Sequence, residues 1–292
     1  MPIWKRALLN CYYHASLPWR RRRANIAARE FRTPIVVLAY HRIAPDRANS
    51  WTTTPEEFAS HLDWLGSKFE FVSLEEAQHR IRCRANSRPC VSVTFDDGYS
   101  VNCEFALPLL LRKQIPVTYF VCSKAVLSGE CFPHDVAMGN RFRPNSVAEL
   151  RKLAEAGISI GCHTRTHANL GPLVDADKIQ DEVVAAGEEL QRAVAAPVRY
   201  FAFPYGQHRN LNPRVFHLAY DAGYEGVCSA YGGYNWPGDD AFHLQRVCVD
   251  GPLIRLKNWA TIDPWKVRNI HRFFYGPEIA PRATQADGAL HA

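Results

Sequence analysis

Short apolar runs alternate with longer amphipathic stretches along most of the 292-residue chain. The apolar runs are rich in β-branched, aromatic and small residues and are bounded by glycine, proline or charged residues, a pattern that predicts strands. Seven strands are predicted on this basis, at residues 35–40, 90–95, 117–121, 158–162, 200–203, 226–228 and 246–249.

The amphipathic stretches between these runs predict helices. The clearest covers residues 177–195, where apolar side chains recur at helical spacing and fall on one face: Ile179, Val183, Ala186, Leu190 and Val194. The other predicted helices are 55–67, 74–82, 101–113, 146–156 and 212–222. Strand followed by helix, repeated this often within about 230 residues, predicts an α/β fold whose parallel sheet closes into a barrel rather than staying open.

Three regions follow from where this pattern begins and fades. Residues 33–265 carry the repeats and form the predicted barrel, as one large domain with appendages. Residues 1–32 form a basic arm with interspersed aromatic residues. Residues 266–292 are predicted to be a tail, in which the aromatic residues 273–275 could dock on the barrel while 281–292 stay loose.

Positive charge is concentrated in the arm. Residues 1–32 hold eight basic residues against Glu30, a net charge of +7, whereas residues 33–292 carry −1 of the chain's total of +6. A near-neutral barrel does not indicate nucleic acid as a partner. The arm's tryptophan, tyrosine, leucine and arginine residues suit the headgroup level of an anionic membrane. The alternative is a helix packed on the barrel with a solvated basic end, and composition does not separate the two.

The cytoplasm is the expected compartment. The basic arm is not followed by the apolar core and cleavage site of an export signal, and no run approaches the ~20 apolar residues of a spanning helix. Nine cysteines, an odd number without a CxxC pair, form no evident disulfide framework. With the basic arm, this predicts work in the cytoplasm at the inner face of the membrane.

Two adjacent carboxylates end the predicted strand 90–95. Asp96 and Asp97 emerge there together, and Gly98 permits a turn that aims both side chains outward. Adjacent carboxylates repel one another, so placing both in a buried site requires a cation or a shared proton. The alternative is an ordinary turn, since Asp-Asp-Gly is common in turns.

Candidate partners for the aspartates follow another predicted strand. His163 and His167 are four residues apart directly after residues 158–162, so that one turn of backbone can present both imidazoles to one point. With Asp97 they form a two-histidine, one-carboxylate set, which leaves a coordination position open as in catalytic zinc sites and also suits iron, cobalt or nickel. Two of the chain's twelve histidines could equally be ordinary surface residues.

A third apolar strand runs into Pro204-Tyr205-Gly206. A backbone stiffened by proline and released by glycine can hold an amide N–H toward a reacting oxygen. Alone, the sequence Pro-Tyr-Gly indicates only a turn.

In this order the segments TFDDG (94–98), HTRTH (163–167) and FAFPYG (201–206) resemble the first three motifs of the polysaccharide deacetylase family, also called the NodB-homology domain or carbohydrate esterase family 4. The resemblance covers about residues 34–250. It implies a distorted (β/α) barrel that uses a divalent metal, with zinc as the first expectation, to remove N-acetyl and occasionally O-acetyl groups from sugars. An N-acetylated carbohydrate is therefore the expected partner.

The resemblance also implies residue roles. By position, Asp96 would be the general base, and Asp97, His163 and His167 would be the metal ligands. The backbone N–H of Tyr205 would help to hold the oxyanion that forms during acyl transfer.

The sequence departs from the family pattern at two places. Ala202 stands where the third motif often begins with an arginine that orients the base. Leu244-Gln245-Arg246 is the best match to a later Leu-x-His motif, so arginine stands where the acid histidine is usual. We predict that Arg246 takes over the missing arginine's role beside Asp96, because a guanidinium can hold a carboxylate through two hydrogen bonds.

The acid that protonates the leaving amine is then expected to be another histidine. We expect His41, because it ends the first predicted strand and a Tyr-His sequence there resembles one branch of the family. His41 could equally be a structural residue at the strand end. His208, two residues beyond the Pro-Tyr-Gly turn, is the second candidate, and His134, in the irregular segment 128–144, is the third.

Together these features predict a metal-dependent deacetylase that hydrolyses the N-acetyl group of a sugar in a cell-envelope glycan or glycolipid precursor. One alternative keeps the metal site and changes the substrate to another non-peptide C–N bond. Another is a carbohydrate-binding homologue whose catalysis has lapsed. Asp96 argues against the latter, since metal binding does not require a second carboxylate.

Overall fold

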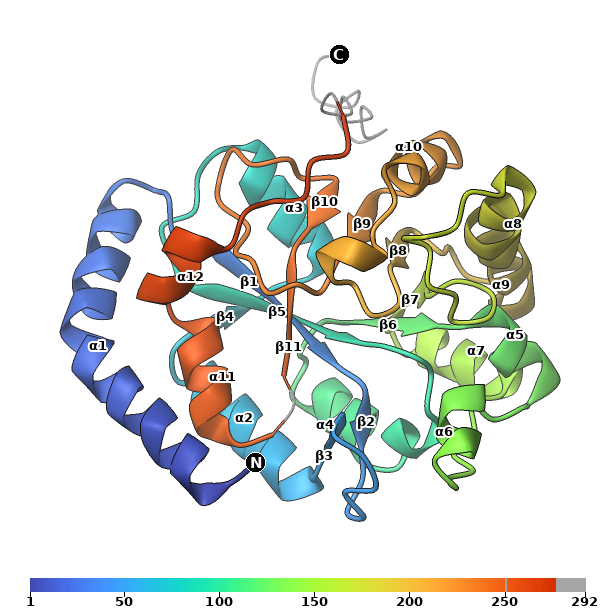
Figure 1. Cartoon of the computed structure of the whole chain (residues 1–292), viewed down its shortest axis with the longest axis horizontal. Helices are drawn as coiled ribbons and strands as arrows, with labels where there is room; N and C mark the ends of the chain where they lie inside the picture. Colours follow the sequence, from blue (N-terminus) through green and yellow to red (C-terminus); the bar gives the residue numbers. More distant parts are fainter. Residues whose placement is uncertain (250, 277–292) are drawn as a thin grey trace.

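The structure, a computed structural model, describes residues 1–249 and 251–276 and is built around one parallel sheet (Figure 1). Its strands are β1 (Ile35–Tyr40), β4 (Glu70–Phe71), β5 (Cys90–Phe95), β6 (Val117–Val121), β7 (Ser159–Cys162), β8 (Tyr200–Ala202), β9 (Gly226–Cys228), β10 (His243–Leu244) and β11 (Arg246–Cys248). A separate two-stranded ladder joins β2 (Arg42–Ile43) to β3 (Thr52–Thr53).

The sheet curls until its two edges nearly meet. Its order is β10-β9-β8-β7-β6-β5-β1-β11, with β4 added beside β5, and every ladder is parallel. The two edge strands, β10 and β11, are separated in sequence only by Gln245. Buried Asn235 joins this seam to β1, because its side chain accepts from the Gln245 N–H at 2.8 Å and its N–H donates to the Ile35 carbonyl at 3.1 Å. The predicted distorted barrel is therefore confirmed.

Strand prediction succeeded where the apolar run was long enough to show a pattern. The predicted segments 35–40, 90–95, 117–121 and 226–228 match β1, β5, β6 and β9. The observed strands β7, β8 and β11 are each one residue shorter than predicted. The predictions missed β2, β3, β4 and β10. Each of these has two residues, too few for a period of two to appear.

Helices cover the outside of the barrel, and most begin at recognisable caps. The Thr54 and Ser146 hydroxyls open their helices in capping boxes completed by Glu57 and Glu149. The helices between the strands are α2 (Pro55–Gly66), α3 (Leu74–Arg82), α4 (Ala106–Arg112), α5 (Ser123–Ser128), α6 (Pro133–Ala137), α7 (Val147–Glu155), α8 (Ala176–Gln180), α9 (Ala186–Val194) and α10 (Pro213–Asp221).

Two predicted helices are interrupted, which corrects the prediction. The segment 101–113 divides into a 3₁₀ turn, Ser100–Cys103, and the helix α4. The segment 177–195 contains a π-helical turn, Asp181–Ala185, between α8 and α9. A π-turn adds one residue to the helical ring and changes the direction in which side chains point, so a spacing of three and four residues does not reveal it.

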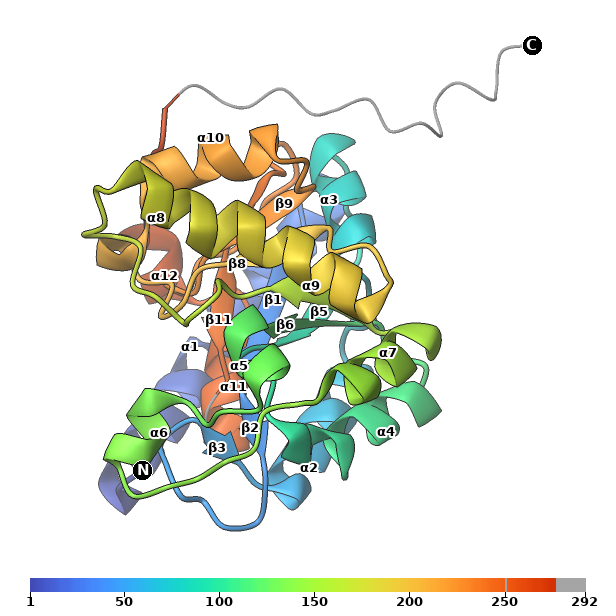
Figure 2. The same cartoon turned by 90° about the vertical axis from the view of Figure 1, so that its right-hand side faces the viewer.

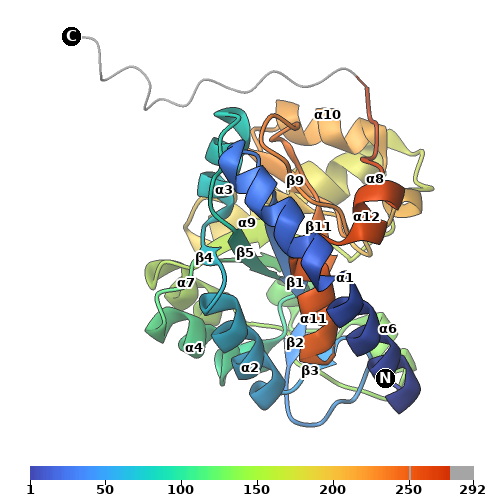
Figure 3. The ribbon, with the colours of Figure 1, turned by 90° about the vertical axis from the view of Figure 1, so that its left-hand side faces the viewer.

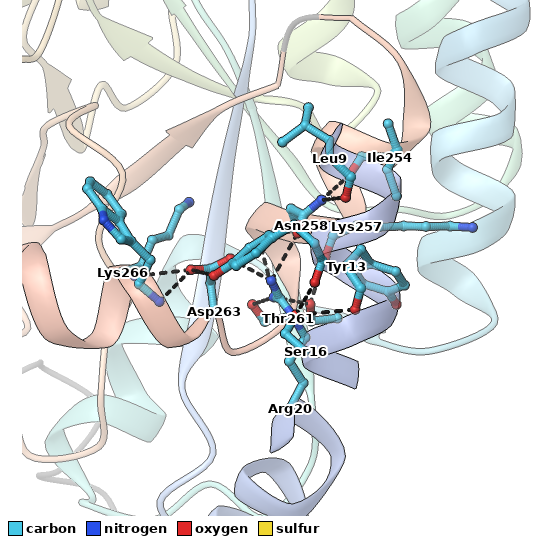
Figure 4. A network of polar contacts seen from close by, with 12 residues as sticks. Leu9, Tyr13, Ser16, Arg20, Ile254, Lys257, Asn258, Thr261, Asp263 and Lys266 are labelled. Carbon is cyan, nitrogen blue, oxygen red and sulfur yellow. Dashed lines mark hydrogen bonds and ion pairs between the residues drawn. The ribbon is translucent and has the colours of Figure 1, made fainter. Parts of the chain in front are cut away.

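The basic arm forms the helix α1 (Ile3–Arg29), which packs on the barrel beside α11 (Leu253–Ala260) and α12 (Pro264–Asn269) (Figure 3). Buried Arg20 fixes this packing. It donates to the Asn258 side chain at 2.9 Å, to Asp263 at 2.6 Å and to the Thr261 hydroxyl at 2.9 Å (Figure 4). The arm is therefore a helix that packs on the barrel through one face, as the second interpretation of its composition predicted.

The C-terminal boundary is less sharp than expected. The predicted division between residues 265 and 266 falls inside α12, and the chain beyond it stays on the barrel, where the Tyr275 ring stacks on Phe216 at 4.1 Å between centroids. Phe273 also packs there, while Phe274 is exposed. The tail predicted at 281–292 lies outside the described residues.

Two further features of the described residues concern membrane-spanning helices and cysteines. No helix within residues 1–249 and 251–276 combines the length and apolar character needed to cross a bilayer. All nine cysteines lie in the described part of the chain and all are free thiols.

Candidate metal centre and active site

The carboxyl ends of β5 and β7 bring three potential metal ligands together. The Nε2 atoms of His163 and His167 lie 3.5 Å and 3.3 Å from Asp97 Oδ1. One ligand atom from each of these three residues lies within 4.8 Å of the other two. Asp97, His163 and His167 therefore come together at one point, as expected from the sequence.

These distances fit a tetrahedral ion. Two ligands about 2.1 Å from a zinc ion and separated by the tetrahedral angle are about 3.4 Å apart, and both Asp97–histidine distances are close to this value. Asp97 Oδ1 is also buried without a hydrogen-bond partner among the described residues, a costly state that a cation relieves. The three residues fit a divalent metal, with a further coordination position left for a water or substrate oxygen.

The backbone is strained where these ligands lie. Asp97, Thr164, His167 and Tyr205 all have positive φ angles, between 62° and 73°, which non-glycine residues seldom adopt. Gly98 follows with a φ of 96°, so the turn that was expected to need glycine does need it. Four such residues around one site indicate that the barrel holds the loops in a fixed conformation that positions these side chains.

His163 is prepared as a ligand by its second ring nitrogen. Its Nδ1–H must be the donor to the Ala202 carbonyl at 2.8 Å, because a carbonyl only accepts. This bond fixes the tautomer and leaves the Nε2 lone pair directed toward Asp97. Burial lowers the pKa of His163 to about 4, so the imidazole is neutral and available to a metal near pH 7.

The two aspartates are both ionised. Burial acts to raise the pKa of Asp97, but nearby His167, with the charges that His41 and His163 carry when protonated, holds it well below its ordinary value. Burial also acts to raise the pKa of Asp96, and the opposing charge of Arg246, with that of His163, keeps it lowered. Arg246, which is always charged, thus compensates buried Asp96, whereas the imidazoles beside the two aspartates supply positive charge only when they are protonated.

Arg246 holds Asp96 through two parallel hydrogen bonds. Its Nη1 donates to Asp96 Oδ1 at 2.6 Å and its Nη2 to Oδ2 at 2.8 Å, while Nε donates to the Ser229 carbonyl at 3.0 Å. The guanidinium is fully buried. The structure therefore places Arg246 beside Asp96, where the sequence predicted it. Each carboxylate oxygen retains a lone pair, and Asp96 Oδ2 lies 4.0 Å from His163 Nε2.

Tyr205 borders the site on another side. Its ring lies 5.0 Å from the His167 ring and its side chain is half exposed. None of the hydrogen bonds among the described residues uses its amide N–H. An amide with no acceptor beside the metal ligands suits the predicted role of oxyanion donor.

The structure separates the three histidines considered for the acid. His41 lies close enough that its charge lowers the pKa values of Asp96 and Asp97. The His134 ring lies 5.2 Å from His167, so the third candidate also borders the site. The His208 ring lies 4.2 Å from the Tyr231 ring in a tilted arrangement, within a different aromatic cluster. His41 and His134 are therefore the histidines placed to reach a leaving group.

Helix α6 forms one wall of the site. It lies in the irregular segment 128–144, and the ring of Phe132, which precedes it, lies 6.1 Å from the His167 ring. The Tyr99 hydroxyl donates to Asp135 at 2.8 Å and lies 3.4 Å from His134 Nε2. These contacts tie α6 to the chain that follows β5.

Glu182 is a positioning residue that the sequence did not reveal. Its carboxylate accepts from the Arg165 and Thr166 N–H groups, both at 2.9 Å, and from the Thr166 hydroxyl at 2.6 Å. It therefore holds the loop between His163 and His167. Glu182 lies in the π-helical turn, whose altered geometry directs it to this loop. The only signal in the sequence was an acidic residue next to Val183, on the edge of the predicted apolar face.

We expect Glu182→Gln to weaken metal binding by about 10–100-fold, as loss of a group that orients ligands commonly does. Competition with a chromophoric chelator measures the affinity. Glu188→Gln is the matched control, because Glu188 lies on the adjoining helix, is exposed and is 3.8 Å from its nearest cationic partner, Arg192. Equal affinities in the two variants would show that Glu182 does not position the histidines.

An open metal position beside an ionised carboxylate is the arrangement of metal-dependent hydrolases. A family model described as polysaccharide deacetylase matches residues 84–227, a span that contains Asp96, the three candidate ligands and Tyr205. The chain belongs to the polysaccharide deacetylase family, whose members hydrolyse carbon–nitrogen bonds other than peptide bonds.

Individual relatives agree with this assignment. YxkH of Bacillus subtilis (strain 168), a protein named for the same family, is 25% identical over 191 residues, which cover 65% of this chain and 62% of the relative's length. The structure of IcaB from Ammonifex degensii is 25% identical and superposes with a TM-score of 0.64 over 78% of this chain and 97% of that one. The Streptococcus pyogenes deacetylase PplD in complex with acetate shares the fold, with a TM-score of 0.65 at 18% identity over 78% of this chain and 98% of that one.

Proposed function

We propose that this chain removes the N-acetyl group from a sugar in a cell-envelope glycan or glycolipid precursor, using a divalent metal held by Asp97, His163 and His167. The observation that carries the proposal is buried Asp96, ionised and held by Arg246 beside the metal ligands. A binding module needs the ligands but has no use for this second carboxylate, which is costly to bury. Zinc is the proposed metal and the cytoplasm the proposed compartment.

A divalent ion in this position supplies Lewis acidity, which polarises the acetyl carbonyl and acidifies a water molecule. Asp96 accepts the proton as the water oxygen adds to the carbonyl carbon. Arg246 keeps the carboxylate in a fixed orientation during this step, since its Nη1 and Nη2 each donate to one oxygen of Asp96. The Tyr205 N–H stabilises the negative charge that develops on the carbonyl oxygen.

Collapse then breaks the C–N bond and releases acetate. The sugar nitrogen must gain a proton as it leaves, and His41 is the proposed donor because it lies near both aspartates. The overall reaction consumes one water molecule and forms acetate and an amino sugar. In this proposal His41 replaces the acid histidine that the family usually has at position 246, and Arg246 at that position orients the base Asp96.

A second candidate function keeps every step and changes the substrate to another non-peptide C–N bond, such as a small cyclic amide. The same base, ligands and oxyanion donor serve either reaction, so the choice depends on the substrate.

Acetate release is the direct test. We expect the zinc- or cobalt-loaded protein to release acetate from at least one class of N-acetylhexosamine oligomer, nucleotide sugar or lipid-linked sugar, and a chelator to abolish the release. The amino sugar should form in equal amount. If metal binds but no acetylated sugar yields acetate, while a cyclic amide is opened, the second candidate function replaces the first.

A further inference from the structure

Helix α1 carries apolar side chains on two opposite faces, and only one face is explained by packing. Arg20 and Ala27 are buried on the side toward α11 and α12, and Leu9 is partly buried there, with Asn258 donating to its carbonyl. Trp4 and Leu8 occupy the other side, each 63% exposed. A folded chain gains nothing from exposing these two large side chains to water, so the outer face calls for a partner.

The N-terminal turns of α1 are the most exposed part of this face. Residues 1–8 are all exposed, including Ile3 at 88%. Figure 3 shows this end of the helix at the outer edge of the molecule, past α11. The exposed apolar group therefore stands clear of the barrel and can reach a surface.

The same helix presents positive charge that packing does not use. Of the eight basic residues in 1–32, Arg20 is buried against Asp263, and the other seven are exposed: Lys5, Arg6, Arg21, Arg22, Arg23, Arg29 and Arg32. None of these seven forms an ion pair within the described part of the chain. Glu30 is the only acidic residue in 1–32, while the rest of the chain is nearly neutral. The charge is therefore complementary to an anionic surface.

The outer end of α1 and the wall of the active site face the same end of the molecule. Figure 2 shows the N-terminus and α6 together at its lower end, and Figure 1 also places both there. Helix α6 borders the metal ligands through the His134–His167 contact, and it presents exposed Val136 and Met138 to solvent. A flat surface that touches the start of α1 at this end thus lies close to the rim of the site.

We propose that the outer face of α1, together with the exposed apolar residues at α6, docks on an anionic lipid bilayer and presents the site to an N-acetylated sugar anchored in that bilayer. Tryptophan and leucine then lie at the headgroup level, and the long basic side chains reach the lipid phosphates. Each cation near such a surface contributes about a fivefold gain in binding. The bilayer contact stands on α1 and α6 alone, whereas the anchored substrate rests on the proposed deacetylation.

Vesicle flotation of the full chain tests the contact. We expect binding to phosphatidylcholine vesicles that contain phosphatidylglycerol, and much weaker binding to phosphatidylcholine alone. Replacing the two exposed basic residues at the outer end of α1 together, Lys5→Gln and Arg6→Gln, should lower the partition coefficient by about 25-fold at low salt and by less at high salt. Trp4→Ser with Leu8→Ser should also release the protein. The control is Val174→Ser with Phe274→Ser, which removes apolar side chains that are even more exposed but lie elsewhere.

Turnover separates the contact from the chemistry. The Trp4→Ser, Leu8→Ser variant should hydrolyse a short water-dissolved acetylated sugar at the normal rate and a vesicle-anchored one more slowly. Vesicle binding without turnover of any acetylated sugar would leave the contact standing and overturn the proposed function. No preference for anionic vesicles would overturn the contact. Concentration-dependent dimerisation that this variant abolishes, without vesicle binding, would show that the outer face of α1 pairs with a second copy.

Discussion

Asp96→Asn is expected to lower kcat for acetate release by about 10²–10⁴-fold while leaving the metal bound. Removal of a positioned general base costs this much, and asparagine keeps the shape of the side chain and an acceptor for Arg246. The metal ligands are untouched, so metal content should remain stoichiometric. Steady-state kinetics measured together with metal analysis therefore distinguish loss of the base from loss of the site.

The chain offers a matched control for this variant. Asp263 is a second buried carboxylate held by a buried arginine, Arg20, at 2.6 Å, but it lies between α1, α11 and α12 (Figure 4). Asp263→Asn should lower stability and leave kcat unchanged at a temperature where the variant is folded. If Asp96→Asn with bound metal kept its rate within tenfold of the original, Asp96 would not be the base.

Arg246→Met should reduce the free energy of unfolding by about 3–5 kcal/mol, since it leaves the buried Asp96 carboxylate without its partner. Methionine retains much of the apolar volume of the arginine stem, and so the loss reflects the unpaired charge more than a cavity. Urea unfolding followed by fluorescence measures the change. Activity should fall as well, because the carboxylate loses the bonds that orient it.

A double-mutant cycle isolates the pair. When Asp96→Asn and Arg246→Met are combined, the buried charge is gone from both sides, so the double variant should be destabilised by clearly less than the sum of the single changes. Additivity within about 0.5 kcal/mol would mean that the two side chains do not stabilise one another. The cycle thus tests the contact without relying on activity.

The sequence was sufficient for the barrel because its strands are continuous apolar runs buried on both faces. All six residues of β1 and of β5 are buried, which is what a parallel sheet covered by helices requires. The candidate ligands were predictable for the same reason. Each follows such a run directly, and the carboxyl ends of parallel strands gather at one end of a barrel.

Other features depended on contacts that no local pattern encodes. Arg246 and Asp96 are 150 positions apart, so no local pattern links them. The pairing was predicted only because Ala202 stands in place of the family's usual arginine and another cation was needed beside Asp96. Glu182 acts through a π-turn that a 3.6-residue period does not register. His134 ranked third for the acid because its proximity to His167 depends on how an irregular segment folds back.

The seam of the barrel also has a consequence for biosynthesis. The strand β11, which carries Arg246, is the last strand of the sheet, and it pairs with β1, the first strand of that sheet. At about 5–20 residues per second, the ribosome adds the 150 residues between Asp96 and Arg246 in roughly 8–30 s. Once His167 has been added, and until Arg246 follows, the nascent chain holds the metal ligands and the base without the cation that allows that base to be buried. Hydrolytic competence is therefore expected to appear only after β11 has been synthesised, so that chains that stop before Arg246 remain inactive.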